Sequence, residues 1–234
     1  MPATPAAILV AAGSGARMGA SSPKALLPLA GRPMLAWSLA ALAAADPVVV
    51  AAPPERVRET EAVVRERRPG AIVVAGGASR AESVAAGLAA EPAASELVVV
   101  HDAARPLLTP EIVAAVVAGL DDADGAIAAR PVADTLKRAD GREPPAIAAT
   151  VDRAPLWAAE TPQAFWVPVL RDAVARARAE GRLAAATDCA SLVEAAGGRV
   201  RLVATPGPNL KVTTPADLAL AEHLLRGAHG AELL

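Results

Sequence analysis

Cysteine and aromatic residues are scarce in this chain of 234 residues. It has one cysteine, Cys189, no tyrosine, one phenylalanine and three tryptophans. A single cysteine excludes an internal disulfide framework and a four-cysteine zinc site, and it is typical of proteins from a reducing compartment. We therefore expect a cytoplasmic protein. The shortage of aromatic rings argues against a surface that stacks the bases of single-stranded nucleic acid.

An excess of basic charge is also missing. The 23 lysines and arginines are balanced by 25 aspartates and glutamates, which gives a formal net charge of −2. Binding of phosphates would therefore require a local cluster of cations, and we expect no nucleic acid as a partner. No apolar run is long enough for a membrane-spanning helix, and no basic region precedes the first apolar run as in a secretory signal, so we expect no membrane partner.

Short β-branched runs alternate with alanine-rich stretches of helical length. This alternation predicts an α/β fold in which helices cover both faces of a mostly parallel, twisted sheet. Neither an internal repeat nor a linker is visible, so we expect a single domain over residues 1–234. We expect strands at 8–10, 48–50, 72–74, 98–100, around Ile127 and at 200–203, and helices at 33–44, 55–67, 79–90, 109–118, 168–179 and 215–225, with Thr109 and Thr214 as N-caps.

Residues 132–153 interrupt the alternation. Two short segments, 133–138 and 146–151, flank a run of Asp, Gly and Pro at 140–145 that is typical of a turn. This pattern predicts a hairpin that extends from the sheet as an arm. Because an isolated two-stranded ribbon is only marginally stable in water, we expect the arm to pack on something else, and a second copy of the chain is the obvious candidate.

The most informative segment follows the first apolar run. Residues 13–19 read GSGARMG, and Lys24 lies in the same connection. A strand that leads into glycine-rich backbone and then into cations is how an α/β sheet gathers phosphates at the carboxyl ends of its strands. Met18 stands where a dinucleotide fingerprint needs glycine, and no Gly-Lys-Ser/Thr follows at P-loop spacing. The segment therefore predicts a phosphate-binding loop of another kind.

Further charges lie where other predicted strands end. Asp102 follows a strand, and because the next helix begins only at Thr109, we favour contact with a metal or a substrate over helix capping. Arg153 and Lys211 each end a segment that we predict to be a strand. Together with Lys24 and Arg17 they would supply the cations that a site for several phosphates requires.

Two polar features are less specific. Gly76, Gly77 and Ser79 follow a strand and begin a helix, which suits recognition of a base or a ribose, although Ser79 is equally well explained as a plain N-cap. We expect His101 to form local hydrogen bonds rather than to act as a catalytic base. The other two histidines, His223 and His229, are expected at the surface.

These motifs resemble a known family over nearly the whole chain, the 2-C-methyl-D-erythritol 4-phosphate cytidylyltransferases of the non-mevalonate isoprenoid pathway. The resemblance rests on a series of blocks that occur in order along the chain. They are 11–18 with 23–24, Gly76 and Gly77 with Arg80 and Ser83, 100–106, Asp134 and Thr135 with Lys137, 150–153, 161–163, 187–188, and 209–213 leading into Pro215 and 217–219.

The resemblance implies a Rossmann-like nucleotidyltransferase fold and transfer of CMP from CTP to 2-C-methyl-D-erythritol 4-phosphate. The products would be pyrophosphate and 4-diphosphocytidyl-2-C-methyl-D-erythritol. Arg17 and Lys24 would stabilise charge on the α-phosphate, and Asp102 would bind Mg²⁺ or another divalent cation. Arg153 and Lys211 would orient the phosphate of the sugar alcohol.

The resemblance also implies a homodimer whose arms help to complete each other's site. Arg105 and Thr135 would reach the phosphate from the neighbouring subunit. Three residues depart from the pattern of many relatives: Ala25, Ala78 and Cys189 stand where polar or acidic residues are common. The residues implied in nucleotide binding are Ala11, Ala12, Gly13, Ser14, Gly15, Gly77, Arg80, Ser83 and Ala103.

Two other functions remain open at this point. A sister cytidylyltransferase that uses ribitol 5-phosphate would share the fold and the CTP loop, although the segment 101–106 favours the methylerythritol substrate. A non-catalytic nucleotide-binding module on the same fold is the second alternative. It is disfavoured because the charged residues implied in catalysis are all present.

Overall fold

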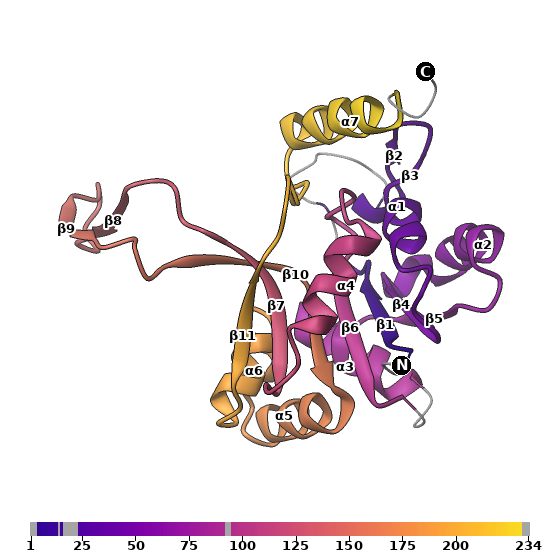
Figure 1. Cartoon of the computed structure of the whole chain (residues 1–234), viewed down its shortest axis with the longest axis horizontal. Helices are drawn as coiled ribbons and strands as arrows, with labels where there is room; N and C mark the ends of the chain where they lie inside the picture. The colour runs from indigo at the N-terminus through magenta and orange to yellow at the C-terminus, as the bar shows by residue number, and fades with distance from the viewer. Residues whose placement is uncertain (1–3, 14, 16–22, 92–94, 231–234) are drawn as a thin grey trace.

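A seven-stranded sheet runs through the centre of the molecule (Figure 1). The structure is a computed structural model, and it describes residues 4–13, 15, 23–91 and 95–230, with side chains up to residue 227. The strands of the sheet are β1 (Ala6–Val10), β4 (Val48–Ala52), β5 (Ile72–Ala75), β6 (Leu97–Asp102), β7 (Gly125–Pro131), β10 (Trp157–Trp166) and β11 (Val200–Ala204). Their spatial order is β11-β7-β10-β6-β1-β4-β5.

Helices cover both faces of this sheet, as predicted. Ala7 and Leu9 of β1 are buried in a core on one face, whereas Ala6 and Ile8 are buried in a core on the other. A strand that is buried on both faces needs a continuous apolar sequence, which is what the first apolar run supplies. The first core contains α1 (Met34–Ala41), α2 (Val57–Arg67) and α4 (Pro110–Ala118), and the second contains α3 (Arg80–Ala90), α5 (Val167–Ala179) and α6 (Cys189–Ala195).

The sequence analysis missed β10. This strand runs antiparallel to both of its neighbours, β6 and β7, so the sheet is mostly but not wholly parallel. It contains Pro162, and proline within a run normally argues against a central strand. The pairing of β10 with β7 shifts register between Ala159 and Gln163, and such an irregularity accommodates a proline that cannot donate to the ladder.

Several helices begin at a residue whose side chain caps the first turn. The hydroxyl of Thr109 accepts a hydrogen bond from the Ile112 N–H, and the Asp217 N–H donates to Thr214, so both predicted N-caps are confirmed. Helix α6, which was not predicted, begins after Asp188, whose carboxylate accepts from the backbone of the first turn. Short 3₁₀ helices occupy Lys24–Leu26, Pro54–Arg56 and Leu183–Ala185.

Helix α7 (Pro215–Gly230) lies apart from the sheet. It packs near the small hairpin of β2 (Pro28–Leu29) and β3 (Arg32–Pro33), over a third apolar cluster (Figure 1). Val212, which precedes α7, is fully buried in this cluster together with Leu29 and Met34. The C-terminal helix therefore anchors the chain segment that leads into it.

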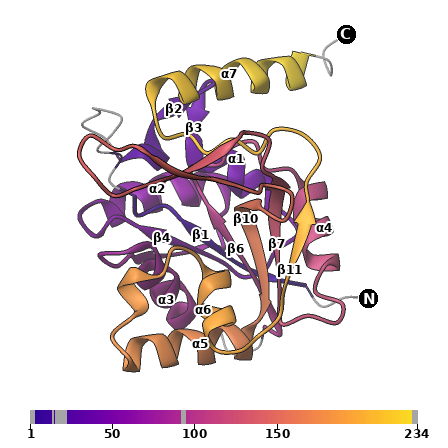
Figure 2. The same cartoon turned by 90° about the vertical axis from the view of Figure 1, so that its left-hand side faces the viewer.

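The predicted arm is confirmed as a hairpin. Its strands β8 (Leu136–Ala139) and β9 (Ile147–Val151) pair antiparallel with each other in a sheet of their own. The arm projects away from the remainder of the molecule in Figure 1, and the side that carries it faces the viewer in Figure 2. The side chain of Ile147 is 68% exposed. No helix within the described part of the chain is long and apolar enough to cross a membrane.

Candidate active site

A cavity of about 440 Å³ opens at the carboxyl ends of β1, β5 and β6. Val10 and Asp102 are paired in the register of β1 and β6, so these two strands end at the same level. Within the sheet, β4 and β5 lie on one side of β1, and β6 lies on its other side. Ligands of open α/β sheets bind at such a reversal of strand order.

The cavity gathers most of the residues that the sequence analysis assigned to a site. Among the predicted catalytic residues, Lys24, Asp102 and Lys211 line it. Arg17 and Ser14 lie outside the residues that the structure describes. The predicted nucleotide-binding residues that line the cavity are Ala11, Ala12, Gly13, Gly15, Gly77, Arg80, Ser83 and Ala103.

Asp102 is the centre of an ion network in the cavity. Its side chain is 7% exposed, and its two oxygens accept from Arg80 Nε at 2.8 Å and from Lys211 Nζ at 2.7 Å. Burial alone would raise the pKa of this carboxyl, but the cations of Arg80 and Lys211 hold the pKa well below its usual range. Asp102 is therefore an anion at any physiological pH, and it fixes the position of two cations in the cavity.

The paired glycines let the backbone approach α3 closely. A Cβ on Gly76 would lie 2.8 Å from Ser83 Oγ, and one on Gly77 would collide with the Glu82 side chain. The Gly77 N–H donates to Ser83 Oγ at 3.1 Å. Ser79 and Glu82 form a capping box at the start of α3, so Ser79 is an N-cap that also lines the cavity.

His101 forms local hydrogen bonds, as expected. The Asp102 N–H donates to Thr161 Oγ1 at 3.1 Å, and this hydroxyl lies 3.0 Å from His101 Nδ1. His101 Nε2 lies 3.1 Å from the Arg105 carbonyl oxygen. Because a carbonyl can only accept, Nε2 carries the proton, and Nδ1 accepts from Thr161. Burial lowers the pKa of His101 to about 4, so the ring is neutral at physiological pH.

Lys211 lies on an irregular segment, not at the end of a strand as predicted. β11 ends at Ala204, and residues 208–213 belong to neither a helix nor a strand. The Val212 N–H donates to the Ala104 carbonyl at 2.8 Å, and Lys24 Nζ donates to the Val212 carbonyl at 2.8 Å. Tertiary hydrogen bonds therefore hold this segment against the cavity.

Comparison with known proteins places this geometry in a family. Residues 6–227 match the 2-C-methyl-D-erythritol 4-phosphate cytidylyltransferase family. Enzymes of that name from Prochlorococcus marinus and Azoarcus sp. are 44% identical over 226 residues and 45% identical over 234 residues. These alignments cover 93% and 97% of this chain, respectively, and 96% of each relative. The chain belongs to this family.

Solved structures agree with this assignment. The crystal structure of the cytidylyltransferase from Thermus thermophilus superposes with a TM-score of 0.77 at 37% identity, over 95% of this chain and all of that one. The structure of 4-diphosphocytidyl-2C-methyl-D-erythritol synthase from Anaerococcus prevotii gives a TM-score of 0.81 at 25% identity, over 95% of this chain and 98% of that chain. The predicted family and fold class are confirmed, and the protein is a nucleotidyltransferase.

In this cytidylyltransferase chain, the predicted phosphate-binding residues of the arm do not reach the cavity. Arg153 and Thr135 are exposed, and neither lines it. The Arg105 side chain is 11% exposed; it lies 3.7 Å from a carboxylate oxygen of Glu160 and donates to the Asn209 carbonyl at 2.6 Å.

Of the departures from the pattern of relatives, Ala25 and Ala78 line the cavity of the cytidylyltransferase. Cys189 is fully buried, and its sulfur accepts from Arg80 at 3.6 Å, so the thiol helps to orient the cation that binds Asp102. Burial raises the pKa of this thiol. Gln163 Oε1 accepts from the Cys189 N–H at 3.1 Å, which fastens α6 to β10.

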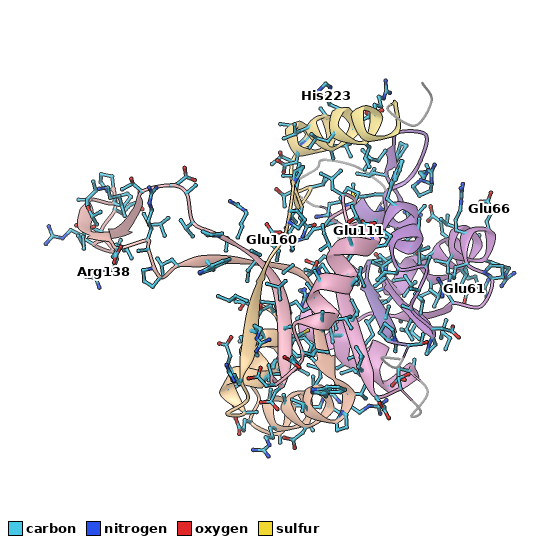
Figure 3. All side chains as sticks on the ribbon, in the orientation of Figure 1. Glu61, Glu66, Glu111, Arg138, Glu160 and His223 are labelled. Carbon is cyan, nitrogen blue, oxygen red and sulfur yellow. The ribbon has the colours of Figure 1, made fainter. Side chains whose placement is uncertain are left out.

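The sequence analysis missed a group of buried polar residues around Thr161, whose hydroxyl accepts from the Asp102 N–H. Glu160, Gln163 and Asn209 are less than 7% exposed and hydrogen-bond one another or the chain around them. Figure 3 shows Glu160 at the base of the arm. Two of the three lie in blocks of the family resemblance, 161–163 and 209–213, which was the available signal. Apart from the bond of Gln163 to the Glu160 carbonyl, their partners come from distant parts of the chain and have no local sequence pattern.

The buried neutral His101 predicts an acid-sensitive fold. The unfolded chain binds a proton at this histidine near pH 6.5, whereas the folded chain does so only near pH 4. Stability is therefore lost as the pH falls through this window, by up to about 3 kcal/mol. Denaturant unfolding of the wild type and of His101→Gln at several pH values between 7 and 4 checks this, because the variant lacks that part of the pH dependence. Equal slopes for the two proteins would contradict it.

Proposed function

We propose that this enzyme transfers the cytidylyl group of CTP to 2-C-methyl-D-erythritol 4-phosphate and releases pyrophosphate. The observation that carries the proposal is the cavity itself, in which Lys24, Arg80 and Lys211 surround glycine-rich backbone at the carboxyl ends of the strands. A nucleoside triphosphate carries three or four negative charges, and clustered cations with exposed backbone N–H groups are the usual means of binding it.

The chemistry needs charge neutralisation more than a base. An oxygen of the sugar-alcohol phosphate attacks the α-phosphorus of CTP, and the bond from that phosphorus to the oxygen of pyrophosphate breaks. The attacking phosphate is already an anion, so the difficulty lies in bringing two anions together and stabilising charge in the transition state. Lys24 supports that role because it lines the cavity. Arg17 is proposed for the same role from the family resemblance, and Lys211 for orientation of the acceptor phosphate.

Asp102 fits a magnesium ion, because each of its oxygens accepts from one cation and keeps a second lone pair that a metal can share. Mg²⁺ typically binds one or two carboxylates together with substrate phosphates and water, so a single buried carboxylate in a phosphate site suits it. Among the described residues, no group of three or more His, Cys, Asp or Glu side chains could hold a metal without substrate. When bound, the cation would neutralise charge on the phosphates and on the departing pyrophosphate.

The arm supports the proposal of a homodimer. It projects from the molecule with Ile147 largely exposed, and an isolated ribbon of this kind is marginally stable. We propose that Arg153 and Thr135 of the arm act at the cavity of a second copy. The role of Arg105 at that phosphate stays a prediction, because its side chain is bound to Glu160 and to the Asn209 carbonyl of its own chain. The described part of the chain packs around one seven-stranded sheet, and this supports a single domain over residues 1–234. A cytoplasmic location stays a prediction from the single cysteine.

Pyrophosphate release tests the reaction directly. The purified protein is incubated with CTP and Mg²⁺ in three arms, with 2-C-methyl-D-erythritol 4-phosphate, with ribitol 5-phosphate and without an acceptor. We expect release that depends on the methylerythritol phosphate. Preferential release with ribitol 5-phosphate would favour the sister activity, and binding of CTP without release in any arm would indicate a non-catalytic module.

Replacement of Lys24 by alanine is expected to lower turnover. Loss of one well-placed donor to transition-state charge typically reduces kcat by about 10²- to 10³-fold. Steady-state kinetics and a thermal melt measure turnover and folding together. Arg65→Ala, which removes an exposed cation from α2, serves as the control and should leave kcat unchanged. A folded Lys24→Ala protein with wild-type turnover would refute the role of Lys24.

Mixing two impaired variants tests whether Arg153 acts on the partner. If each cavity takes Lys24 from one chain and Arg153 from the other, a mixed dimer of Lys24→Ala and Arg153→Ala contains one intact site. Subunit exchange at equal concentrations should then restore about a quarter of wild-type activity. If Arg153 serves its own chain, both sites of the mixed dimer remain impaired, and activity does not rise above that of the separate variants.

A further inference from the structure

Lys211 depends on contacts that its own backbone cannot provide. It lies in the irregular segment 208–213, yet its Nζ lies 2.7 Å from Asp102 in the cavity. A lysine side chain has many rotamers, so a fixed ion pair on an irregular segment requires that the backbone be held from outside. The hydrogen bonds of Val212 hold the segment on one side of Lys211. The part of the segment that precedes Lys211 needs an attachment of its own.

Asn209 attaches the part of the segment that precedes Lys211. It is 4% exposed, and its Nδ2 donates to Glu160 Oε2 at 2.9 Å and to the Thr161 carbonyl at 2.8 Å. Both partners are acceptors, which fixes the orientation of the amide. The Asn209 carbonyl accepts from Arg105 at 2.6 Å, so both the side chain and the backbone of this residue are fastened.

Thr161 of β10 also contacts Asp102. The hydroxyl of Thr161 accepts from the Asp102 N–H at 3.1 Å, while the carbonyl of Thr161 accepts from Asn209. Thr161 lies where the pairing of β10 with β7 shifts register. One residue of the irregular part of β10 therefore contacts both the strand that carries the anion and the segment that carries Lys211.

We propose that Asn209 is a positioning residue, which sets Lys211 opposite Asp102 by binding the Glu160-Thr161 pair of β10. The geometry requires a neutral group that donates two hydrogen bonds in one plane, and an asparagine side chain supplies it. An aspartate would place a second carboxylate beside Glu160. An alanine would leave the two acceptors without this donor and would release the segment two residues before Lys211.

The proposal rests on the proposed role of Lys211 in orienting the acceptor phosphate. A double-mutant cycle distinguishes the positioning role of Asn209 from that role of Lys211. Kinetics are measured for the wild type, Asn209→Ala, Lys211→Ala and the double variant, with CTP and 2-C-methyl-D-erythritol 4-phosphate varied in turn. Asn209→Ala should raise KM for the sugar-alcohol phosphate by about tenfold and KM for CTP much less, because it displaces Lys211. In the Lys211→Ala background the same substitution should change KM less than about twofold.

A control variant, a measurement of folding and a substitute variant complete the test. Pro208→Ala changes an exposed neighbour in the same segment and should leave both KM values unchanged. Thermal melts show whether each variant is folded, and Asn209→Ser replaces Asn209→Ala in the cycle if the latter is unfolded at the assay temperature. Equal effects of the Asn209 substitution in both backgrounds would overturn the positioning role alone. A Lys211→Ala variant with unchanged KM would overturn the role of Lys211 and the proposal with it.

Discussion

The arrangement of the site depends on a buried carboxylate that lies between two cations. Asp102 ends β6, Arg80 begins α3, and Lys211 comes from the segment before α7, with hydrogen bonds of 2.8 and 2.7 Å at the centre. An isolated buried carboxylate would be costly, and removal of one partner of such a pair leaves a charge uncompensated. The three chain regions therefore meet at a single anion, which holds the two cations close to each other.

This arrangement also concentrates positive charge locally. The chain has a formal net charge of −2, yet the charged residues among those described around the cavity are Lys24, Arg80, Lys211 and Asp102, three cations and one anion, for a local balance of +2. Like charges repel in a partly buried cavity, and Asp102 offsets the repulsion between two of them. Groups that are held in place before the phosphates arrive need little reorganisation during the reaction, which is a large source of electrostatic catalysis.

Local sequence patterns predicted the parts of this structure that depend on local physics. The central strands β1, β4 and β6 have continuous apolar runs because they are buried on both faces, and Thr109 and Thr214 were recognisable as caps. β10 was missed because it carries polar residues around Pro162, and their partners are Asp188, Asn209 and other distant groups. Lys211 was predicted at a strand end because its partners are likewise distant in the sequence. Its surroundings follow from tertiary hydrogen bonds, which leave no periodic signal.

The site therefore has two kinds of support. The residues proposed for the nucleotide lie at strand ends and in glycine turns that the core fixes directly, and these were the positions that sequence reasoning placed in the cavity. The residues proposed for the acceptor phosphate lie on the irregular segment before α7, which tertiary hydrogen bonds hold in place, and on the arm, whose strands pair with each other in a sheet of their own. The geometry of the segment before α7 rests on a few specific bonds, such as those of Asn209, and the arm residues are proposed to act at the cavity of a second copy. Substitutions in these segments are thus the ones expected to change acceptor binding without disturbing the core that holds the nucleotide.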